Sequence, residues 1–583
     1  MTTFKIDTAT RGGKAWFSRW IIQRMALFGL FGWLGVTLSS IWWFFPWQWG
    51  TLFSGGRFAY AFWWSVPLAV VGGYLAVYAQ LKLQGRSERQ QAEQAAAANA
   101  KTPEEEAIER AEYLAARRAG FTGLEIGTST GELLERRGHK GGLPSGTPVV
   151  LSPEDCAKNI IAFGGIGSGK TSRFINPLML QLMEQNAGAL VLDIKTDFQR
   201  EVAAITAHVG REYKTVGDGG MTLNLLRGTT PELAASFLKS CFLAQGTGDS
   251  QIWADLATEH CRNCLTLLKL AGGDYSLAGL YGIAIDDKAR RALVEQTDAA
   301  FDDMSDRDQR LQSAVVRYFM TWDDYDDRQK SSVMVNVNSV LTPFSHPDLV
   351  DAFSTGSEQG EADLTELIND GAVFLVNLPQ TKFGKEGARY AYLLIKLRFF
   401  NMMRERRTRQ DWNQSRPVAF ICDEYQSIVD SVSDTDFWDK SRSSKTIGIV
   451  SMQGVASLTQ ALNGNHKAAE AILQNFRQRV VFRTEDEATL RHVQHLLGQI
   501  DVVLTSTGDS YSESQSWTGL GMGGRQGTYS QSTSESENAS MTRQDLFSAN
   551  DMRALDANHC LLIGNIGDRA ADEVLQVAPL YIN

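Results

Sequence analysis

One short motif constrains the fold of this 583-residue chain more than any other feature. Residues 164–171 match the GxxxxGK[ST] pattern of a phosphate-binding loop, in which glycines let backbone N–H groups surround an anion. An apolar run at 159–163 precedes the motif, and an amphipathic stretch at 172–183 follows it. This order predicts a strand, the loop and a helix whose positive end faces the phosphates. The residues expected to bind nucleotide are Gly164, Gly165, Ile166, Gly167, Ser168, Gly169, Lys170, Thr171 and Ser172.

The motif implies ATP and Mg²⁺ as ligands. We expect Lys170 to neutralise charge on the β and γ phosphates and Thr171 to place its hydroxyl on Mg²⁺. A second predicted strand, 418–423, ends in the adjacent acids Asp423 and Glu424. We expect Asp423 to hold the metal and Glu424 to polarise the attacking water, as a general base or a water-positioning group. Adjacent acids also occur as plain turn residues, and their pairing with the phosphate loop favours the functional interpretation.

Three polar residues beside later strands are weaker candidates. Gln453 follows the predicted strand 446–452, where its amide could contact a γ-phosphate; the alternative is an ordinary amide at a strand end. Arg477 and Arg479 precede another strand, where a cation could reach the nucleotide of a neighbouring subunit and stabilise transition-state charge. Surface salt bridging is the alternative for both arginines.

Another strand, 189–193, ends in Asp193 and is followed by Lys195. Ligands gather at the carboxyl ends of strands in α/β sheets, so this pair is placed near the nucleotide or a pore. A salt-bridged turn without a role in binding explains the same residues.

Short apolar runs alternate with amphipathic stretches after residue 141, which is typical of an α/β fold with a parallel sheet. A helix-like acidic segment interrupts this pattern, so we predict a nucleotide-binding domain at 141–226 and 353–583 with an inserted all-α domain at 227–352. A charged helical linker is predicted at 83–140 and a flexible Ser/Gly-rich loop at 505–541. The predicted strands are 159–163, 189–193, 372–378, 418–423, 446–452, 479–482 and 560–563.

The N-terminal residues 1–82 differ in character from the rest of the chain. Residues 25–45 and 59–78 carry no charged side chain, and each run is long enough to cross a bilayer as a helix. Basic residues precede the first run and follow the second, whereas Arg57 is the single basic residue of the short connector. Because basic flanks stay on the cytoplasmic side, both termini are expected in the cytoplasm. The predicted membrane anchor is therefore a two-helix transmembrane hairpin; a buried hairpin in a soluble core is the alternative.

The charge and cysteine content add limits. A net charge of −10 argues against a protein that coats DNA non-specifically, although it permits a local basic channel. Six cysteines are scattered through the chain, as expected for a cytoplasmic bulk. Cys261 and Cys264 form a lone CxxC, and no second ligand pair for zinc is spaced suitably nearby, which favours packing in a core.

The order of these parts resembles the coupling proteins of type IV secretion and conjugation systems, the TraG/TraD-like membrane ATPases. The resemblance includes Trp253 at the start of the inserted segment and residues 545–548 near the C-terminal end. It implies a RecA-like ATPase domain, a homo-hexamer around a central channel, and a place in the inner membrane beside other secretion components. The family's usual Asp-Pro-Lys-Gly strand end reads Asp-Ile-Lys-Thr here, at residues 193–196.

The resemblance leaves the cargo open. The leading hypothesis is an ATP-driven motor that transfers single-stranded DNA with its relaxase. One alternative is the same motor exporting protein effectors without DNA. Another is a membrane receptor or scaffold that uses nucleotide only as an assembly switch, which the complete set of Lys170, Thr171, Asp423 and Glu424 disfavours.

Overall fold

The computed structural model describes residues 34, 82, 103–244, 250–354, 360–517 and 527–582. The chain divides into two units, Met1–Ala111 and Glu112–Asn583. Apart from Leu34, the predicted membrane spans 25–45 and 59–78 lie outside the described residues. Within the described residues, no helix is both long and apolar enough to cross a membrane. Helix α4 (Pro103–Arg118) begins at the proline that is favoured at a first helical position.

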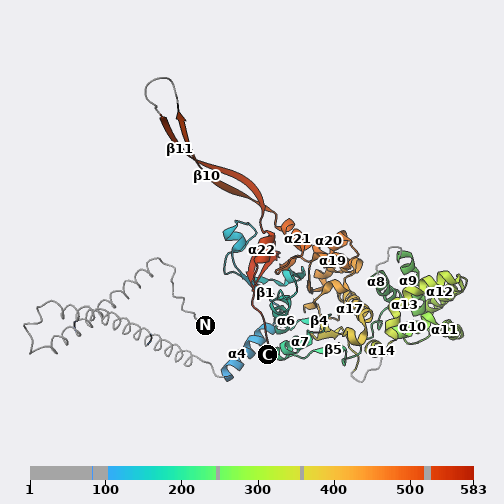
Figure 1. The fold of residues 1–583 in the computed structure, drawn as a ribbon. Coiled ribbons are helices and arrows are strands. Elements are labelled where there is room, and N and C mark those ends of the chain that lie inside the picture. Colours follow the sequence, from blue (N-terminus) through green and yellow to red (C-terminus); the bar gives the residue numbers. More distant parts are fainter. Residues whose placement is uncertain are drawn as a thin grey trace, which may run out of the picture. The chain divides into compact units, whose positions relative to one another are not determined.

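An eleven-stranded sheet forms the centre of the unit Glu112–Asn583 (Figure 1). One part of the sheet is parallel, as the alternating sequence pattern predicts. Its strands in spatial order are β9 (Gln478–Val481), β3 (Ile160–Phe163), β8 (Thr446–Met452), β7 (Val418–Cys422), β4 (Gly188–Asp193), β6 (Val373–Asn377) and β5 (Lys214–Gly217). Beyond β9 the pairing is antiparallel, through β12 (His559–Ile563), β15 (Glu573–Gln576), β1 (Leu124–Ser129) and β2 (Pro148–Leu151).

The central strands are apolar on both faces because helices cover both. Ile161 and Phe163 of β3 belong to one buried cluster, together with residues of α17 (Lys385–Arg406). Ile160 and Ala162 belong to another, together with residues of α6 (Asn176–Glu184) and α7 (Gln199–Val209). Side chains of a strand alternate between faces, so continuous apolar runs are what a strand covered on both faces requires.

All the predicted strands are present, with ends within one or two residues of the expected positions. The predicted linker 83–140 is wrong at its C-terminal end, because β1 lies within it and pairs with β15 and β2. Leu124 and Ile126 are buried, Glu125 between them is exposed, and the strand continues with the non-apolar residues Gly127, Thr128 and Ser129. A strand buried on one side alternates, so it does not appear as an apolar run.

The chain between β5 and β6 is helical. Cys261 and Cys264 lie on α9 (Ser250–Leu270) and are fully buried in the core, in agreement with the packing interpretation. Burial raises the pKa of the Cys264 thiol to about 12. The helices of this segment are α8 (Pro231–Leu243), α9 (Ser250–Leu270), α10 (Leu277–Ile285), α11 (Asp287–Ala299), α12 (Asp306–Asp323), α13 (Asp327–Leu341) and α14 (Pro347–Phe353).

A long antiparallel ribbon occupies most of the segment predicted as a loop at 505–541. Strands β10 (Gln499–Trp517) and β11 (Gly527–Asp545) pair without interruption from Gln499 opposite Asp545 to Trp517 opposite Gly527 (Figure 1). The expectation of a Ser/Gly-rich loop is wrong for the paired residues, because pairing satisfies the backbone N–H and C=O groups within the ribbon itself. A Ser- and Thr-rich sequence can therefore form strands without burying a core.

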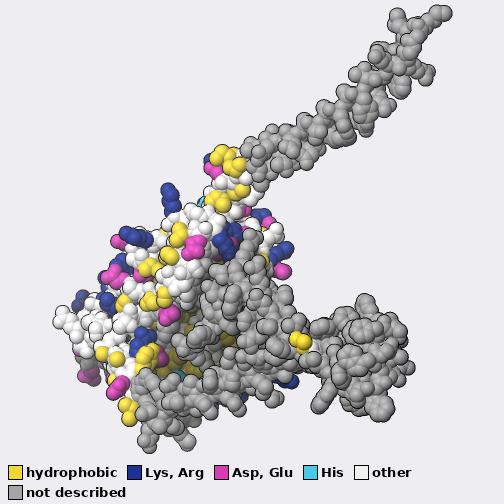
Figure 2. All heavy atoms as spheres, turned by 90° about the vertical axis from the view of Figure 1, so that its left-hand side faces the viewer, with side chains coloured by type: hydrophobic (Ala, Val, Ile, Leu, Met, Phe, Trp, Pro, Cys, Tyr) yellow, Lys and Arg dark blue, Asp and Glu magenta, His cyan; other side chains and the backbone are white. Residues whose placement is uncertain are grey.

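Surface charges of both signs are interspersed. Figure 2 shows Lys and Arg side chains beside Asp and Glu on the described part of the face it presents. Several exposed basic residues are paired within their own helix, for instance Arg491 with Glu487 at 2.5 Å.

A buried ion pair holds the segment that follows β7. Lys396 of α17 and Asp434 of α18 (Ser431–Lys440) are both inaccessible to solvent, and Nζ lies 2.5 Å from Oδ1. The same Nζ donates to the carbonyl of Ile428 at 2.5 Å, and Asp434 Oδ2 accepts from the amide of Asp430 at 3.0 Å. Each charge therefore has polar partners, which a buried pair needs to offset its desolvation.

Removing one partner of this pair should destabilise the protein strongly. We expect Lys396→Met to lower the free energy of unfolding by about 3–5 kcal/mol, because it leaves a buried carboxylate without its cation. The double variant Lys396→Met/Asp434→Leu should recover most of that loss. Urea unfolding of the full chain, followed by tryptophan fluorescence, measures both. The exposed Arg491→Met serves as the control with a change below about 0.5 kcal/mol, and a single variant as stable as the double would contradict the prediction.

Candidate nucleotide-binding site

The phosphate loop joins β3 to the helical turn Thr171–Ile175 that leads into α6. Gly167 and Gly169 have φ angles of 72° and 91°, a region that residues with a Cβ rarely adopt. A Cβ on Gly164 would lie 2.6 Å from Ser168 Oγ. The glycines are therefore required by backbone conformation and by close packing, as the motif predicts.

Lys170 is held inside this loop. Its Nζ donates to the carbonyls of Gly164 at 2.7 Å and Gly165 at 3.2 Å, and its side chain is 7% exposed. Burial lowers the pKa of Lys170, against the opposing effect of the nearby carboxylates of Asp423 and Glu424. Among the described residues Lys170 forms no ion pair, so its charge is available to an anion that enters the loop.

Asp423 follows the last residue of β7 and lies beside Thr171. Thr171 Oγ1 is 3.4 Å from Asp423 Oδ2, while Ser451 Oγ of β8 donates to Oδ1. The Glu424 amide also donates to Oδ1, at 3.0 Å. A hydroxyl and a carboxylate at this spacing are the oxygen ligands that Mg²⁺ prefers beside a nucleotide, so Thr171 and Asp423 fit the role expected of them.

Glu424 is held by several side chains in a conformation with left-handed φ of 58°. Its carboxylate receives hydrogen bonds from Gln453 Nε2 at 3.4 Å and from Gln426. A non-glycine residue in this region costs about 1 kcal/mol, and such strain concentrates at functional sites. The structure thus places Gln453 beside Glu424, the residue expected to polarise the attacking water.

Lys195 bridges the two acids. Its Nζ lies 2.5 Å from Glu424 Oε1 and 3.2 Å from Asp423 Oδ2. Burial lowers the pKa of Lys195, but its bonds and charge interactions with these carboxylates outweigh that effect and raise it overall. The nearby Asp193 stabilises its own loop, since its carboxylate accepts hydrogen bonds from the backbone amides of Asp197 and Phe198.

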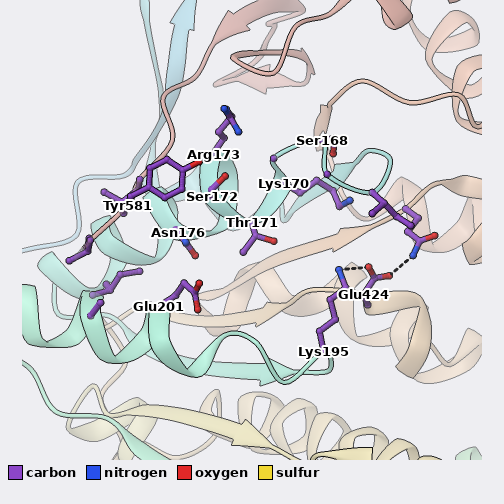
Figure 3. Close-up of a pocket in the computed structure, with 18 residues that line it drawn as sticks. Ser168, Lys170, Thr171, Ser172, Arg173, Asn176, Lys195, Glu201, Glu424 and Tyr581 are labelled. Carbon is purple, nitrogen blue, oxygen red and sulfur yellow. Dashed lines mark hydrogen bonds and ion pairs between the residues drawn. The ribbon is translucent and has the colours of Figure 1, made fainter.

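A cavity of about 670 Å³ opens beside the phosphate loop, with Lys170 and Thr171 in its wall (Figure 3). Glu424, Lys195 and Gln453 line it near the phosphate loop. Other lining residues were not predicted from the sequence, because Asn176, Glu201 and Tyr581 belong to no motif and approach the loop only through the fold.

The arginines predicted to act on a neighbouring nucleotide lie elsewhere. Arg477 is exposed and directly precedes β9, and its amide donates to the carbonyl of Lys158 at 3.0 Å. It therefore sits at the amino ends of the parallel strands β3 and β9, opposite the edge that carries the phosphate loop. Arg479 is half-buried and donates to the carbonyl of Leu473 at 2.8 Å; burial lowers its pKa to about 10. A role of Arg477 in another subunit stays a prediction.

The chain combines a mixed α/β fold with a phosphate-loop motif at the carboxyl edge of its parallel strands. The loop follows β3, the acidic pair follows β7, and β8 lies between these two strands. Residues 417–557 match a family model described as the TraM recognition site of TraD and TraG. Over these residues the chain is similar to the TraG and TraD proteins that the model describes.

Solved structures support the same fold. An unbound form of the bacterial conjugative coupling protein TrwB is 14% identical, with a TM-score of 0.50, and the match covers 78% of this chain and 93% of that one. The plasmid coupling protein TrwB in complex with ADP and Mg²⁺ is 13% identical, with a TM-score of 0.51 and coverage of 80% and 97%. TrwB in complex with a non-hydrolysable GTP analogue is 13% identical, with a TM-score of 0.51, and the match covers 80% of this chain and 96% of that one. No curated protein matches the sequence of this chain.

One residue beside the site carries backbone strain. Thr196 follows Lys195 and has a φ of 63°, which is unfavourable for a β-branched residue. The resembling family has glycine at this position of its Asp-Pro-Lys-Gly motif, where no Cβ opposes the left-handed conformation.

Thr196→Gly should therefore stabilise the protein, by about 1 kcal/mol. Thermal unfolding of the full chain measures the change. Thr365→Gly is the matched control, because Thr365 has an ordinary φ of −66° and its replacement should lower stability. A loss of stability in both variants would show that Thr196 is unstrained.

Proposed function

We propose that this chain is a type IV secretion coupling protein, an inner-membrane ATPase that recruits a relaxase–DNA complex and drives its transfer during conjugation. The observation that carries the ATPase proposal is the convergence of Lys170, Thr171 and Glu424 on one cavity, with the Asp423 carboxylate 3.4 Å from Thr171 Oγ1. The family match over residues 417–557 supports the coupling role. TrwB, which has a similar fold, was solved in complex with nucleotides, and this supports the proposal that the present chain binds nucleotide.

Each group has a proposed part in hydrolysis. Lys170 would bind the β and γ phosphates, while Thr171 and Asp423 would hold Mg²⁺, whose charge would offset the negative charge that develops during phosphoryl transfer. Glu424 accepts a proton from the attacking water. Lys195 and Gln453 fix the orientation of the Glu424 carboxylate through the contacts they make with it.

The assembly and location of the motor are part of the proposal. The uncharged runs 25–45 and 59–78 would anchor it in the inner membrane as a multi-pass protein with both termini in the cytoplasm. Six copies would surround a channel, with Arg477 reaching a neighbour. Because the family model is described as a TraM recognition site, an adaptor of that kind is the expected partner of residues 417–557.

Two substitutions test the catalytic assignment. Glu424→Gln should bind MgATP but lower turnover about 100-fold or more, because proton transfer by a positioned base contributes that much. Lys170→Ala should abolish both nucleotide binding and turnover. Phosphate release by the full chain in membranes and DNA transfer between cells measure the effects, and the exposed Glu470→Gln on α20 (His466–Gln474) is the control. Wild-type transfer in either site variant would refute the mechanism. Negligible turnover by the wild type with substrate present would favour a nucleotide-switched scaffold.

The nature of the cargo is tested separately. If the motor moves DNA, single-stranded DNA should stimulate its ATPase activity, and the stimulation should fall as salt concentration rises, because phosphate contacts release counterions. Crosslinking in intact cells should join relaxase to residues 227–352. Insensitivity to DNA together with effector peptides in the crosslinks would identify a protein exporter with the same engine.

A further inference from the structure

The nucleotide cavity continues beyond the part that the phosphate loop and the acids account for. In Figure 3, Glu424 and Lys195 lie on one side of Thr171, while Asn176, Glu201 and Tyr581 lie on the other. All of them line the same cavity. A triphosphate bound at Lys170 would therefore extend its nucleoside toward this second group of residues.

Two buried acceptors in this second group lack partners. Asn176 Oδ1 and Glu201 Oε2 are shielded from solvent and accept no hydrogen bond from any described residue. The Asn176 side chain belongs to a residue only 6% exposed, at the start of α6. A buried polar atom without a hydrogen-bond partner lowers stability by about 1–3 kcal/mol. A ligand with O–H or N–H donors would remove this penalty at both oxygens.

The C-terminal segment supplies an aromatic ring at the same place. The amide of Leu580 donates to the carbonyl of Ser172 at 2.8 Å, which ties this segment to the helical turn after the phosphate loop. Leu580 and Ile582 pack against the buried cluster beneath α6, and Tyr581 between them is 73% exposed. An anchored backbone with an exposed flat ring is suited to stacking on a base.

We propose that Tyr581, Glu201 and Asn176 form the nucleoside subsite of the ATP site. The base stacks on the Tyr581 ring, Glu201 Oε2 accepts a hydrogen bond from the ribose 2′-hydroxyl, and Asn176 Oδ1 accepts from a further donor of the nucleoside. The subsite rests on the proposed function, because it requires the triphosphate to bind at Lys170. It makes Tyr581 and Glu201 determinants of nucleotide affinity without a part in the hydrolysis step.

Calorimetric titration of the full chain in detergent separates the two ends of the site. The ligands are MgATP, Mg-dATP and Mg-tripolyphosphate, the last of which has no nucleoside. Tyr581→Ala should raise the Kd for MgATP about 10- to 100-fold, the range expected for loss of one stacked base, and leave tripolyphosphate binding unchanged. Tyr581→Phe keeps the ring and should restore the affinity for MgATP.

Glu201→Ala tests the sugar contact. The wild type should bind MgATP more tightly than Mg-dATP, and this preference should disappear in Glu201→Ala while tripolyphosphate affinity is kept. Wild-type affinity for MgATP in Tyr581→Ala, or equal losses for MgATP and tripolyphosphate, would overturn the subsite. A wild-type chain that binds neither ligand would refute the proposed ATPase instead, so the two failures are distinguishable.

Discussion

Parallel pairing of β3, β8 and β7 is the constraint on which the site depends. The pairing sets Phe163 beside Met452 and aligns Cys422 with Val450, so the carboxyl ends of these strands meet at one edge of the sheet. Thr171 and Asp423 are far apart in the chain, yet this register brings their oxygens within 3.4 Å. The ligand site of an open α/β sheet lies at this edge for the same reason.

Electrostatics completes what the sheet begins. Two carboxylates on neighbouring residues repel one another, and both Asp423 and Glu424 are nearly buried. Lys195, from the end of β4, supplies the opposing charge and contacts both. Lys195 therefore compensates the charge of both acids. Lys170, on the phosphate loop, forms no ion pair among the described residues, so its charge is available to an incoming phosphate. The two lysines thus differ in their contacts: Lys195 pairs with the two acids, while Lys170 contacts only carbonyls of its own loop among the described residues.

Local signals predicted the centre of the fold well. The phosphate loop and each covered strand are single continuous segments of the sequence, so a motif or an apolar run is enough to locate each of them. Strands β1 and β15 at the antiparallel end are short and partly polar, and β10 and β11 have the composition of a loop, so those elements were missed or misassigned. Glu201 and Tyr581 could not be found in this way, because only tertiary packing brings α7 and the C-terminal segment to one cavity.

The surroundings of the acidic pair also connect the site to the inserted helices. Asp430 lies a few residues beyond Glu424, and its Oδ2 accepts hydrogen bonds from Ser433 at 2.8 Å and from Ser240 of α8 at 3.4 Å. Arg389 of α17 donates a hydrogen bond to the carbonyl of Ala244, the residue that directly follows α8. The buried pair of Lys396 and Asp434 fixes this segment against α17. Since packed interiors deform little, a displacement of the chain after Glu424 must either move α8 or break these buried contacts. The first helix of the insert is therefore mechanically linked to the residue that would activate water.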